Sequence, residues 1–313
     1  MTHPHTTAPV LVTGASGYIA SWVIQKLLTQ GYTVHATVRD LNKSKSFAHL
    51  EKIAENSPGT LKLFQANLLS PGSFDAAMQG CEIVFHMASP FVVTNYKDAV
   101  KDIIEPAILG TENVLKSVNH TESVKRVIVT SSIASTYGDA IDILQTENNS
   151  FDESHWNSTS SETHQPYPYS KVMAERKAWE MAEAQDRWQL VCINPALVFG
   201  KSLTPNTQSG SVEVLQQFAN GMTLLGVPPM WNGVVDVQDV AEAHLRAAFK
   251  PEAQGRYIIC SESLSLVEMG QILRAHFGNK FPFPRNQLPK AAFKLFGPLA
   301  GFSPKFVELN MGY

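Results

Sequence analysis

Residues 10–31 read VLVTGASGYIASWVIQKLLTQG, and this stretch decides the fold. It opens with three apolar residues, passes through a glycine-rich turn, and has helical periodicity from Ser21 to Gln30, with Gly31 closing the helix. A strand, a glycine turn and a helix in this order predict the first βαβ unit of a nucleotide-binding sheet. The glycines let the backbone approach a pyrophosphate, and the amide groups at the helix start meet its charge.

The glycine spacing in this turn is Gly14-x-x-Gly17-x-x-Ala20 rather than the Gly-x-Gly-x-x-Gly of the standard dinucleotide fingerprint. A glycine pattern alone is also typical of a tight packing turn, but its place between strand and helix favours phosphate binding. The predicted cofactor contacts here are Gly14, Ser16, Gly17, Tyr18 and Ile19.

Residues 33–38 are β-branched and alternating, which predicts a second strand, and Arg39 and Asp40 follow it. In NAD-selective sites an acidic residue at this strand end holds the ribose 2′-hydroxyl, whereas an arginine accommodates a 2′-phosphate. Because Arg39 comes first, NADP is the predicted cofactor, and Asp40 keeps NAD open. Lys43 or Lys45 is either a second cation for the phosphate or part of an ordinary solvated helix start.

Further strands are predicted at 61–64, 83–86, 127–132 and 190–194, and a long helix over 100–119 is expected to bend or restart at its proline. Ligands of open parallel sheets bind outside the carboxyl ends of the strands. At those ends lie the small residues Ala88 and Ser89, which would let a cofactor come close to the backbone, and Ser132. The Ser132 hydroxyl is either a hydrogen-bond donor to a substrate oxygen or a turn cap.

The segment Tyr167-Pro168-Tyr169-Ser170-Lys171 opens a periodic run that predicts another helix. Positions four apart share one helix face, so the Tyr167 phenol and the Lys171 ammonium can enter the same space. At about 4 Å and an effective dielectric of about 20, the ammonium favours the phenolate by roughly 4 kcal/mol. The prolines place Tyr167 in the first helical turn. Such a pair is also common on solvated helices, so its neighbours in the fold decide its meaning.

The whole composition is that of a soluble globular protein: 313 residues, 44% hydrophobic, 17% charged and a net charge of -3. No basic block indicates nucleic acid, and no run of 18 apolar residues indicates a membrane span, so a cytoplasmic protein is expected. Cys81, Cys192 and Cys260 are scattered, which predicts neither a disulfide nor a metal site; the last two fall in apolar runs that predict buried strands.

The predicted fold is α/β, with a doubly wound, mostly parallel sheet and a smaller C-terminal α/β part. We expect a dinucleotide-binding domain over 1–195 and a substrate-binding domain over 196–313, partly interleaved with the first, because the βα rhythm loosens after residue 195. The polar segment 139–166 runs straight into the Tyr167 helix and is expected to border the substrate.

Eight motifs together resemble the extended short-chain dehydrogenase/reductase superfamily, most closely its dihydroflavonol-reductase-like branch. They are TGASGYIASWVIQKLL, ATVRD, FHMASP, VTSSIAS, YPYSK, INPALVFG, VVDVQDVAEAH and GRYII. The resemblance implies that Ser132, Tyr167 and Lys171 are catalytic and that Arg39 takes the 2′-phosphate. It also implies that Val198, just beyond Pro195, lies where the family holds the nicotinamide carboxamide, so the predicted cofactor contacts also include Tyr167, Lys171, Pro195 and Val198.

The chain departs from that branch at several positions. Tyr137 stands where plant dihydroflavonol reductases have an asparagine that recognises the flavonoid ring. Asn67 stands where the family usually has an aspartate that contacts adenine. Asn67 and Leu68 are both predicted cofactor contacts. The signature of cinnamoyl-CoA reductases before the tyrosine is absent, and members of the branch usually continue past the point matching Tyr313. Tyr137 and Trp231 are the predicted substrate contacts. Further aromatic or apolar candidates for the pocket walls are Trp156, Tyr169 and Met230.

The predicted function is an NADPH-dependent reductase that passes hydride to the carbonyl of an aldehyde or ketone, aromatic or bulky, and acts as a monomer or homodimer. A sugar-nucleotide epimerase or dehydratase with tightly bound NAD is the alternative, and Arg39 argues against it. A redox-sensing NADP-binding protein is a third class, but it would not need Ser132, Tyr167 and Lys171 together.

Overall fold

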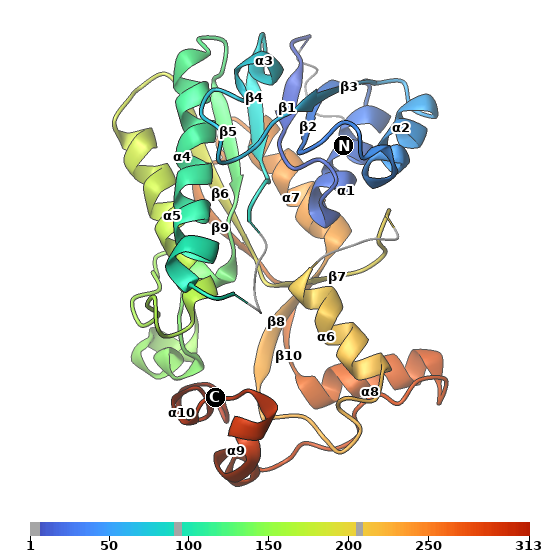
Figure 1. Cartoon of the computed structure of the whole chain (residues 1–313), viewed down its shortest axis with the longest axis vertical. Helices are drawn as coiled ribbons and strands as arrows, with labels where there is room; N and C mark the ends of the chain where they lie inside the picture. Colours follow the sequence, from blue (N-terminus) through green and yellow to red (C-terminus); the bar gives the residue numbers. More distant parts are fainter. Residues whose placement is uncertain (1–6, 91–95, 205–208) are drawn as a thin grey trace.

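The computed structural model describes residues 7–90, 96–204 and 209–313, arranged as a large sheet with flanking helices and a smaller module at one end of it (Figure 1). The large sheet has the strand order β3-β2-β1-β4-β5-β6-β9, and every neighbouring pair is parallel. Its strands are β1 (Val10–Val12), β2 (Thr33–Val38), β3 (Thr60–Gln65), β4 (Ile83–His86), β5 (Arg126–Thr130), β6 (Gln189–Pro195) and β9 (Gly255–Ile259). The order reverses between β1 and β4, and this confirms the predicted doubly wound sheet.

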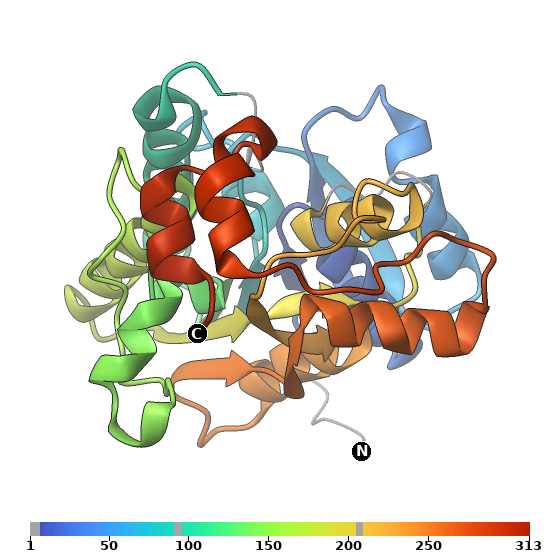
Figure 2. The ribbon, with the colours of Figure 1, turned by 90° about the horizontal axis from the view of Figure 1, so that it is seen from below.

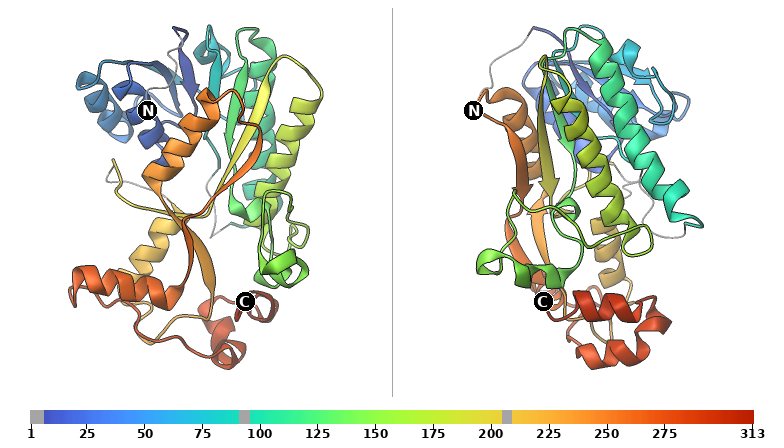
Figure 3. Two further views of the ribbon diagram at one scale, coloured as in Figure 1. Left: turned by 180° about the vertical axis from the view of Figure 1, so that it is seen from behind. Right: turned by 90° about the vertical axis from the view of Figure 1, so that its left-hand side faces the viewer.

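Helices cover both faces of this sheet (Figure 3). One face carries α3 (Asp75–Met78), α4 (Glu105–His120) and α5 (Pro166–Glu183), and the other carries α1 (Tyr18–Thr29), α2 (Ala48–Glu55) and α7 (Val237–Phe249). A π-helical turn, Val100–Ile104, precedes α4, whose second residue is Pro106, so the long helix restarts at its proline as expected.

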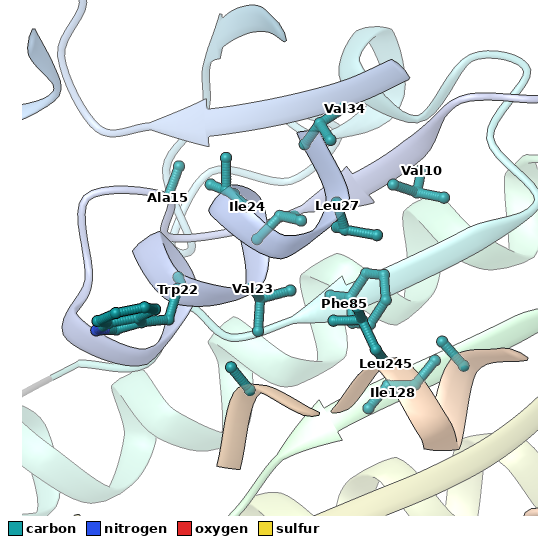
Figure 4. Close-up of a cluster of buried hydrophobic side chains, with 14 of the residues drawn as sticks. Val10, Ala15, Trp22, Val23, Ile24, Leu27, Val34, Phe85, Ile128 and Leu245 are labelled. Carbon is teal, nitrogen blue, oxygen red and sulfur yellow. The ribbon is translucent and has the colours of Figure 1, made fainter. Parts of the chain in front are cut away.

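Strand side chains alternate between the two faces and so build two separate cores. Val10 and Val12 of β1 belong to the core beneath α1 and α7, whereas Leu11 belongs to the core beneath α4. Figure 4 shows the first core, in which Val23 and Leu27 of α1 pack near Phe85 of β4. Strands buried on both faces read as continuous apolar runs, which is why β1, β4, β5 and β6 were predicted from sequence.

The smaller module is built on a second sheet, with the order β10-β8-β7. It contains β7 (Leu197–Phe199), β8 (Trp231–Asp236) and β10 (Glu262–Ser265), with α6 (Gly210–Ala219), α8 (Leu266–Phe277), α9 (Lys290–Phe296) and α10 (Pro304–Asn310). After β8 the chain returns to the large sheet through α7 and β9 before it enters β10. The division at residues 195 and 196 stays a prediction.

The end of the described chain lies beside the segment that precedes the tyrosine helix. In Figures 1 and 2, α10 sits next to the short 3-10 helix Ala140–Gln145. The Asn310 side chain accepts a hydrogen bond from the backbone N–H of Ala140 at 2.9 Å and donates one to Asp139 Oδ1 at 2.6 Å. Residues more than 160 positions apart in the sequence are therefore in direct contact. None of the helices in the three described ranges combines the length and apolar character needed to cross a bilayer.

Candidate active site

A cleft of about 1660 Å³ lies at the carboxyl ends of the large sheet's strands and continues into the smaller module. Pockets for single small ligands are usually about 300–1,000 Å³, so this one has room for a dinucleotide and a substrate together. Its lining includes all the residues predicted for catalysis, for cofactor binding and for direct substrate contact: Gly14, Ser16, Gly17, Tyr18, Ile19, Arg39, Lys43, Asn67, Leu68, Ala88, Ser89, Ser132, Tyr137, Tyr167, Lys171, Pro195, Val198 and Trp231. The structure thus brings the whole set to one cavity, while the role of each residue stays a prediction.

The glycine turn has the geometry of a phosphate cradle. Gly14 has φ +66°, and a Cβ there would lie 2.8 Å from the Cα of Ala88, so a side chain is excluded by both backbone conformation and space. Gly17 is the N-cap of α1 and provides no side-chain cap, which leaves the amides of the first turn open towards the cleft. An uncapped helix start beside a glycine turn fits the pyrophosphate of a dinucleotide.

Two residues around this turn hold it in place. The Thr13 hydroxyl accepts hydrogen bonds from the backbone N–H groups of Met87 and Ala88, both at 3.0 Å, and so joins the ends of β1 and β4. The Tyr18 hydroxyl donates to the carbonyl of Gly200 at 2.8 Å. Burial, assisted by Asp236, raises the pKa of Tyr18 to about 12. Tyr18 therefore contributes a fixed neutral phenol, and Thr13 is a structural residue that the sequence analysis missed.

Two oppositely charged side chains, Arg39 and Asp40, follow the end of β2 and have different surroundings. Asp40 Oδ1 accepts hydrogen bonds from the backbone and side-chain nitrogens of Asn42, at 2.9 and 3.2 Å, and so closes the turn after the strand. Arg39 is exposed on the cleft and forms no ion pair within the described ranges, and Lys43 lines the same stretch. A cationic rim with its carboxylate engaged in a turn fits a 2′-phosphate better than a 2′-hydroxyl.

The tyrosine helix begins where the prolines predicted. Pro166 is the first residue of α5, so Tyr167 lies in its first turn. The Lys171 Nζ atom is 5.3 Å from the centroid of the Tyr167 ring and donates a hydrogen bond to Ser89 Oγ at 2.8 Å. The ammonium thus bridges the tyrosine helix and the exit of β4.

Ser132 adopts extended backbone geometry directly after β5, and its Oγ accepts a hydrogen bond from the Ala134 N–H at 3.2 Å. This is the capping role that the sequence left open. Ser132 also lines the cleft, so its hydroxyl proton remains available to a substrate oxygen. Capping and donation are compatible, because one uses the oxygen lone pair and the other uses the proton.

Two histidines close to these groups are buried. His86 and His244 are 3% and 0% exposed, and burial lowers the pKa of each to about 4, so both rings are neutral at pH 7. His86 lies 3.1 Å from Thr13 Oγ1, and His244 lies 2.7 Å from Thr130 Oγ1. Neither is placed to exchange protons with solvent.

The substrate end of the cleft combines residues from three parts of the chain. Tyr137 stacks on Phe151 with ring centroids 4.6 Å apart, and Trp231 at the start of β8 is 44% exposed. Met230 and Phe306 also line the cavity. Phe306 and Asn310 were missed because α10 has few residues and no sequence signal that links it to a site 170 positions earlier.

Other expectations at this end were wrong. Trp156 does not line the cleft; it lies between the guanidinium groups of Arg176 and Arg256, 4.8 and 3.9 Å from its ring. Tyr169 is not part of the lining either, because it is two positions from Tyr167 and so faces another side of the helix.

Cys260 is exposed rather than buried, because β9 ends one residue before it.

The family resemblance implies a contact between Val198 and the cofactor, but in this structure the Val198 N–H already has a hydrogen-bond partner. The backbone N–H of Val198 donates a hydrogen bond to Ser211 Oγ at 3.0 Å. A nicotinamide carboxamide that used this N–H would have to displace Ser211.

The comparisons with known proteins agree with this geometry. Residues 10–260 match the model of the NAD dependent epimerase/dehydratase family, and the chain belongs to this family, the extended short-chain dehydrogenases/reductases. Within it the chain falls in the dihydroflavonol-reductase-like branch. It is 39% identical over 283 residues to a cinnamoyl-CoA reductase of Medicago truncatula, covering 90% of this chain and 82% of that protein.

A dihydroflavonol 4-reductase of Gerbera hybrida is 32% identical over 296 residues, covering 91% of this chain and 78% of that protein. Among solved structures, the yeast methylglyoxal/isovaleraldehyde reductase Gre2 in complex with NADPH superposes with a TM-score of 0.74. Its sequence is 26% identical, and the match covers 96% of both chains.

Proposed function

We propose that this chain is an NADPH-dependent reductase that transfers hydride to the carbonyl carbon of an aldehyde or ketone. The observation that carries the proposal is that Ser132, Tyr167 and Lys171 open into the same cleft as an uncapped glycine turn and the Arg39 rim. The relatives are reductases, and one solved neighbour carries NADPH. Bound NADPH supplies the hydride, and its phosphates would be held by the glycine turn and by Arg39 with Lys43.

In this proposal the protein's own groups stabilise charge and move one proton. Ser132 donates a hydrogen bond to the carbonyl oxygen, where negative charge develops. Tyr167 donates a second hydrogen bond and then its proton, as the general acid. The Lys171 Nζ atom lies 5.3 Å from the centroid of the Tyr167 ring, and its contact with Ser89 fixes its position on the cofactor side of the cleft. Lys171 is also the residue expected to hold the nicotinamide ribose.

The lining of the cleft favours an uncharged substrate of aromatic or bulky apolar character. Among the described residues that line it, the basic ones are Arg39, Lys43, Lys45 and Lys171. The first three lie at the β2 end, and Lys171 at the reacting centre. The opposite end is lined by Tyr137, Met230, Trp231 and Phe306. A coenzyme A thioester or a nucleotide sugar would bring phosphates to this end without an arginine or lysine to meet them.

The test is to follow NADPH and NADH consumption with aromatic aldehydes, aliphatic aldehydes, ketones, diketones and an aromatic acyl-coenzyme A thioester. The proposal predicts turnover with NADPH and uncharged carbonyls, and highest kcat/KM for aromatic or bulky ones. Absence of any carbonyl-dependent NADPH oxidation, together with NAD retained through purification, would favour the epimerase or dehydratase reading instead.

The compartment and assembly belong to the same proposal. Three cysteines that are scattered along the chain fit a reducing, cytoplasmic setting. A monomer or a homodimer is expected, and sedimentation of the purified protein distinguishes them.

A further inference from the structure

Glu175 is a carboxylate whose side chain is 0% exposed, in the middle of the tyrosine helix α5. It stands eight residues after Tyr167 and four after Lys171, so the three side chains follow one another along a single helix face. The mechanism proposed above does not use it. A buried charge that has no role in the reaction needs an account of what it does there.

The two oxygens of Glu175 are fully engaged, and none of their partners is Lys171. Oε2 accepts hydrogen bonds from Ser131 Oγ and Ser135 Oγ, both at 2.5 Å, and from Asn194 Nδ2 at 2.8 Å. Oε1 accepts one from Arg256 Nε at 2.6 Å. The Lys171 ammonium is directed to Ser89 instead. Glu175 therefore does not act as the counter-ion of the catalytic lysine.

Two of the three donors to Oε2, Ser135 and Asn194, also hydrogen-bond to the backbone of Ser132. The Ser135 hydroxyl lies 2.7 Å from the carbonyl oxygen of Ser132, and Asn194 Nδ2 lies 3.2 Å from the same oxygen. Ser135 has one hydroxyl proton, which either Glu175 or that carbonyl can accept. The Asn194 amide has two protons, for Glu175, that carbonyl and Ser135 Oγ, which lies 2.8 Å away. Glu175 thus orients the two side chains that hold the turn on which Ser132 stands.

Arg256 neutralises the buried carboxylate and comes from β9, on the far side of β6. Its guanidinium is stacked on Trp156 and donates to the carbonyls of Glu153 and His155. A buried ion pair seldom stabilises a fold more than apolar residues of the same volume do. Stability alone therefore does not explain why the chain has Glu175 and Arg256 at these two positions. The ion pair alone does not explain why Oε2 accepts hydrogen bonds from two serines of the turn and from Asn194.

We propose that Glu175 is a positioning residue for Ser132. It fixes the 131–135 turn against the helix that carries Tyr167 and Lys171, so that the Ser132 hydroxyl faces the cleft opposite the tyrosine. The inference rests on the proposed function, because it requires Ser132 to contact the substrate.

The test begins with two variants that remove the contact in different ways. In Glu175→Gln the new amide nitrogen faces donors whichever way it turns, Arg256 on one side and Asn194 on the other. Ser135→Ala removes the hydrogen bond between Ser135 and Glu175 without changing the net charge. If Glu175→Gln does not fold, Ser135→Ala alone tests the proposal. For both we expect kcat to fall about 10-fold or more. The carbonyl KM and the NADPH Kd, the latter from nucleotide fluorescence, should stay within about threefold.

The decisive step repeats both substitutions in a Ser132→Ala background. Because the effect is transmitted through the Ser132 hydroxyl, each should then change the remaining kcat by less than about twofold. Glu183→Gln, the same substitution at an exposed position of the same helix, is the control and should behave as wild type.

Equal losses in both backgrounds, or matched losses in kcat and in NADPH affinity, would overturn the inference and leave Glu175 a structural residue. Wild-type kcat in Ser132→Ala alone would overturn the proposed catalytic role of Ser132, a separate failure. A low kcat in Ser132→Ala with wild-type kcat in Glu175→Gln and Ser135→Ala would overturn this inference only.

Discussion

Arg39 and Asp40 are adjacent residues with opposite charges, and the folded turn gives their side chains different surroundings. The Asp40 carboxylate closes its own turn through Asn42, while the Arg39 guanidinium is left on the cleft. Sequence alone left NAD open because both residues follow the same strand. The cofactor preference depends on which of the two is engaged by the local backbone, and that is a property of the folded turn.

Arg39→Ala should therefore weaken NADPH selectively. A hydrogen bond to a charged group contributes roughly 1.5–3 kcal/mol, so the KM for NADPH should rise about 10- to 100-fold. The KM for NADH should stay within about threefold. Steady-state kinetics with both nucleotides measure this, with the exposed Lys52→Ala as control. An equal loss for NADPH and NADH would mean that Arg39 does not contact the 2′-phosphate.

The buried histidines predict a loss of stability in mild acid. The unfolded chain protonates His86 and His244 below about pH 6.5, but the folded chain does so only near pH 4. Between those values the unfolded state binds more protons, so stability is complete above pH 6.5 and falls as the pH decreases towards 4. Each histidine contributes on the order of 3 kcal/mol over that window. Burial also lowers the pKa values of His35 and His49, which adds in the same direction.

Urea unfolding between pH 7 and pH 4.5 checks this prediction. The unfolding free energy of the wild type should fall steadily, and His244→Asn should make the pH dependence shallower. His120→Asn, at an exposed position, should leave the slope unchanged. A free energy of unfolding that stays constant down to pH 4.5 would contradict the neutral burial of these rings.

At the element scale, the start of α5 is set by a strained residue and a distant helix. Gln165, the N-cap of α5, has φ +55°, a left-handed conformation that is rare for a residue with a side chain. Its amide donates to Asp139 Oδ1 at 2.7 Å, and His164 Nε2 lies 2.8 Å from Oδ2 of the same carboxylate. Asn310 of α10 completes this buried group. The smaller module thus helps to hold the backbone two residues before Tyr167.

Asn310→Ala should loosen α10 from the cleft rim without touching the cofactor end. We expect the KM for a bulky carbonyl to rise about 5- to 20-fold, while the NADPH Kd stays within about twofold, because one buried hydrogen-bonding group is lost at the substrate end alone. Lys305→Ala, on the exposed side of α10, is the matched control. An unchanged carbonyl KM would show that α10 does not shape the substrate end.

The elements that sequence predicted and those that it missed differ in one physical respect. Buried parallel strands such as β4 and β6 have strong local signals, because they form continuous apolar runs. By contrast, β8 contains Gly233 and ends in an acid, and β7 has three residues. Their pairing comes from tertiary contacts between segments far apart in the chain, so no local pattern could reveal it.

At the scale of the whole molecule, the candidate site was predictable where it uses the shared edge of one sheet. The rule that parallel strands present their carboxyl ends together was enough to gather the glycine turn and Ser132 into one cleft, and the family resemblance added Tyr167 to them. The rule does not reach side chains from the smaller module, so Phe306 and Asn310 were missed and Trp156 was misplaced. It also gave no sign of the network around Glu175, which depends on β9 returning beside β6.

The central claim is that Tyr167 donates the proton to the reduced carbonyl. The most direct measurement is the single-turnover rate of carbonyl-dependent NADPH oxidation by Tyr167→Phe, with Tyr169→Phe on the same helix as control. We expect a loss of roughly 10²- to 10⁴-fold for Tyr167→Phe, with NADPH affinity retained, and a wild-type rate for the control. A Tyr167→Phe rate within a few-fold of wild type would contradict it.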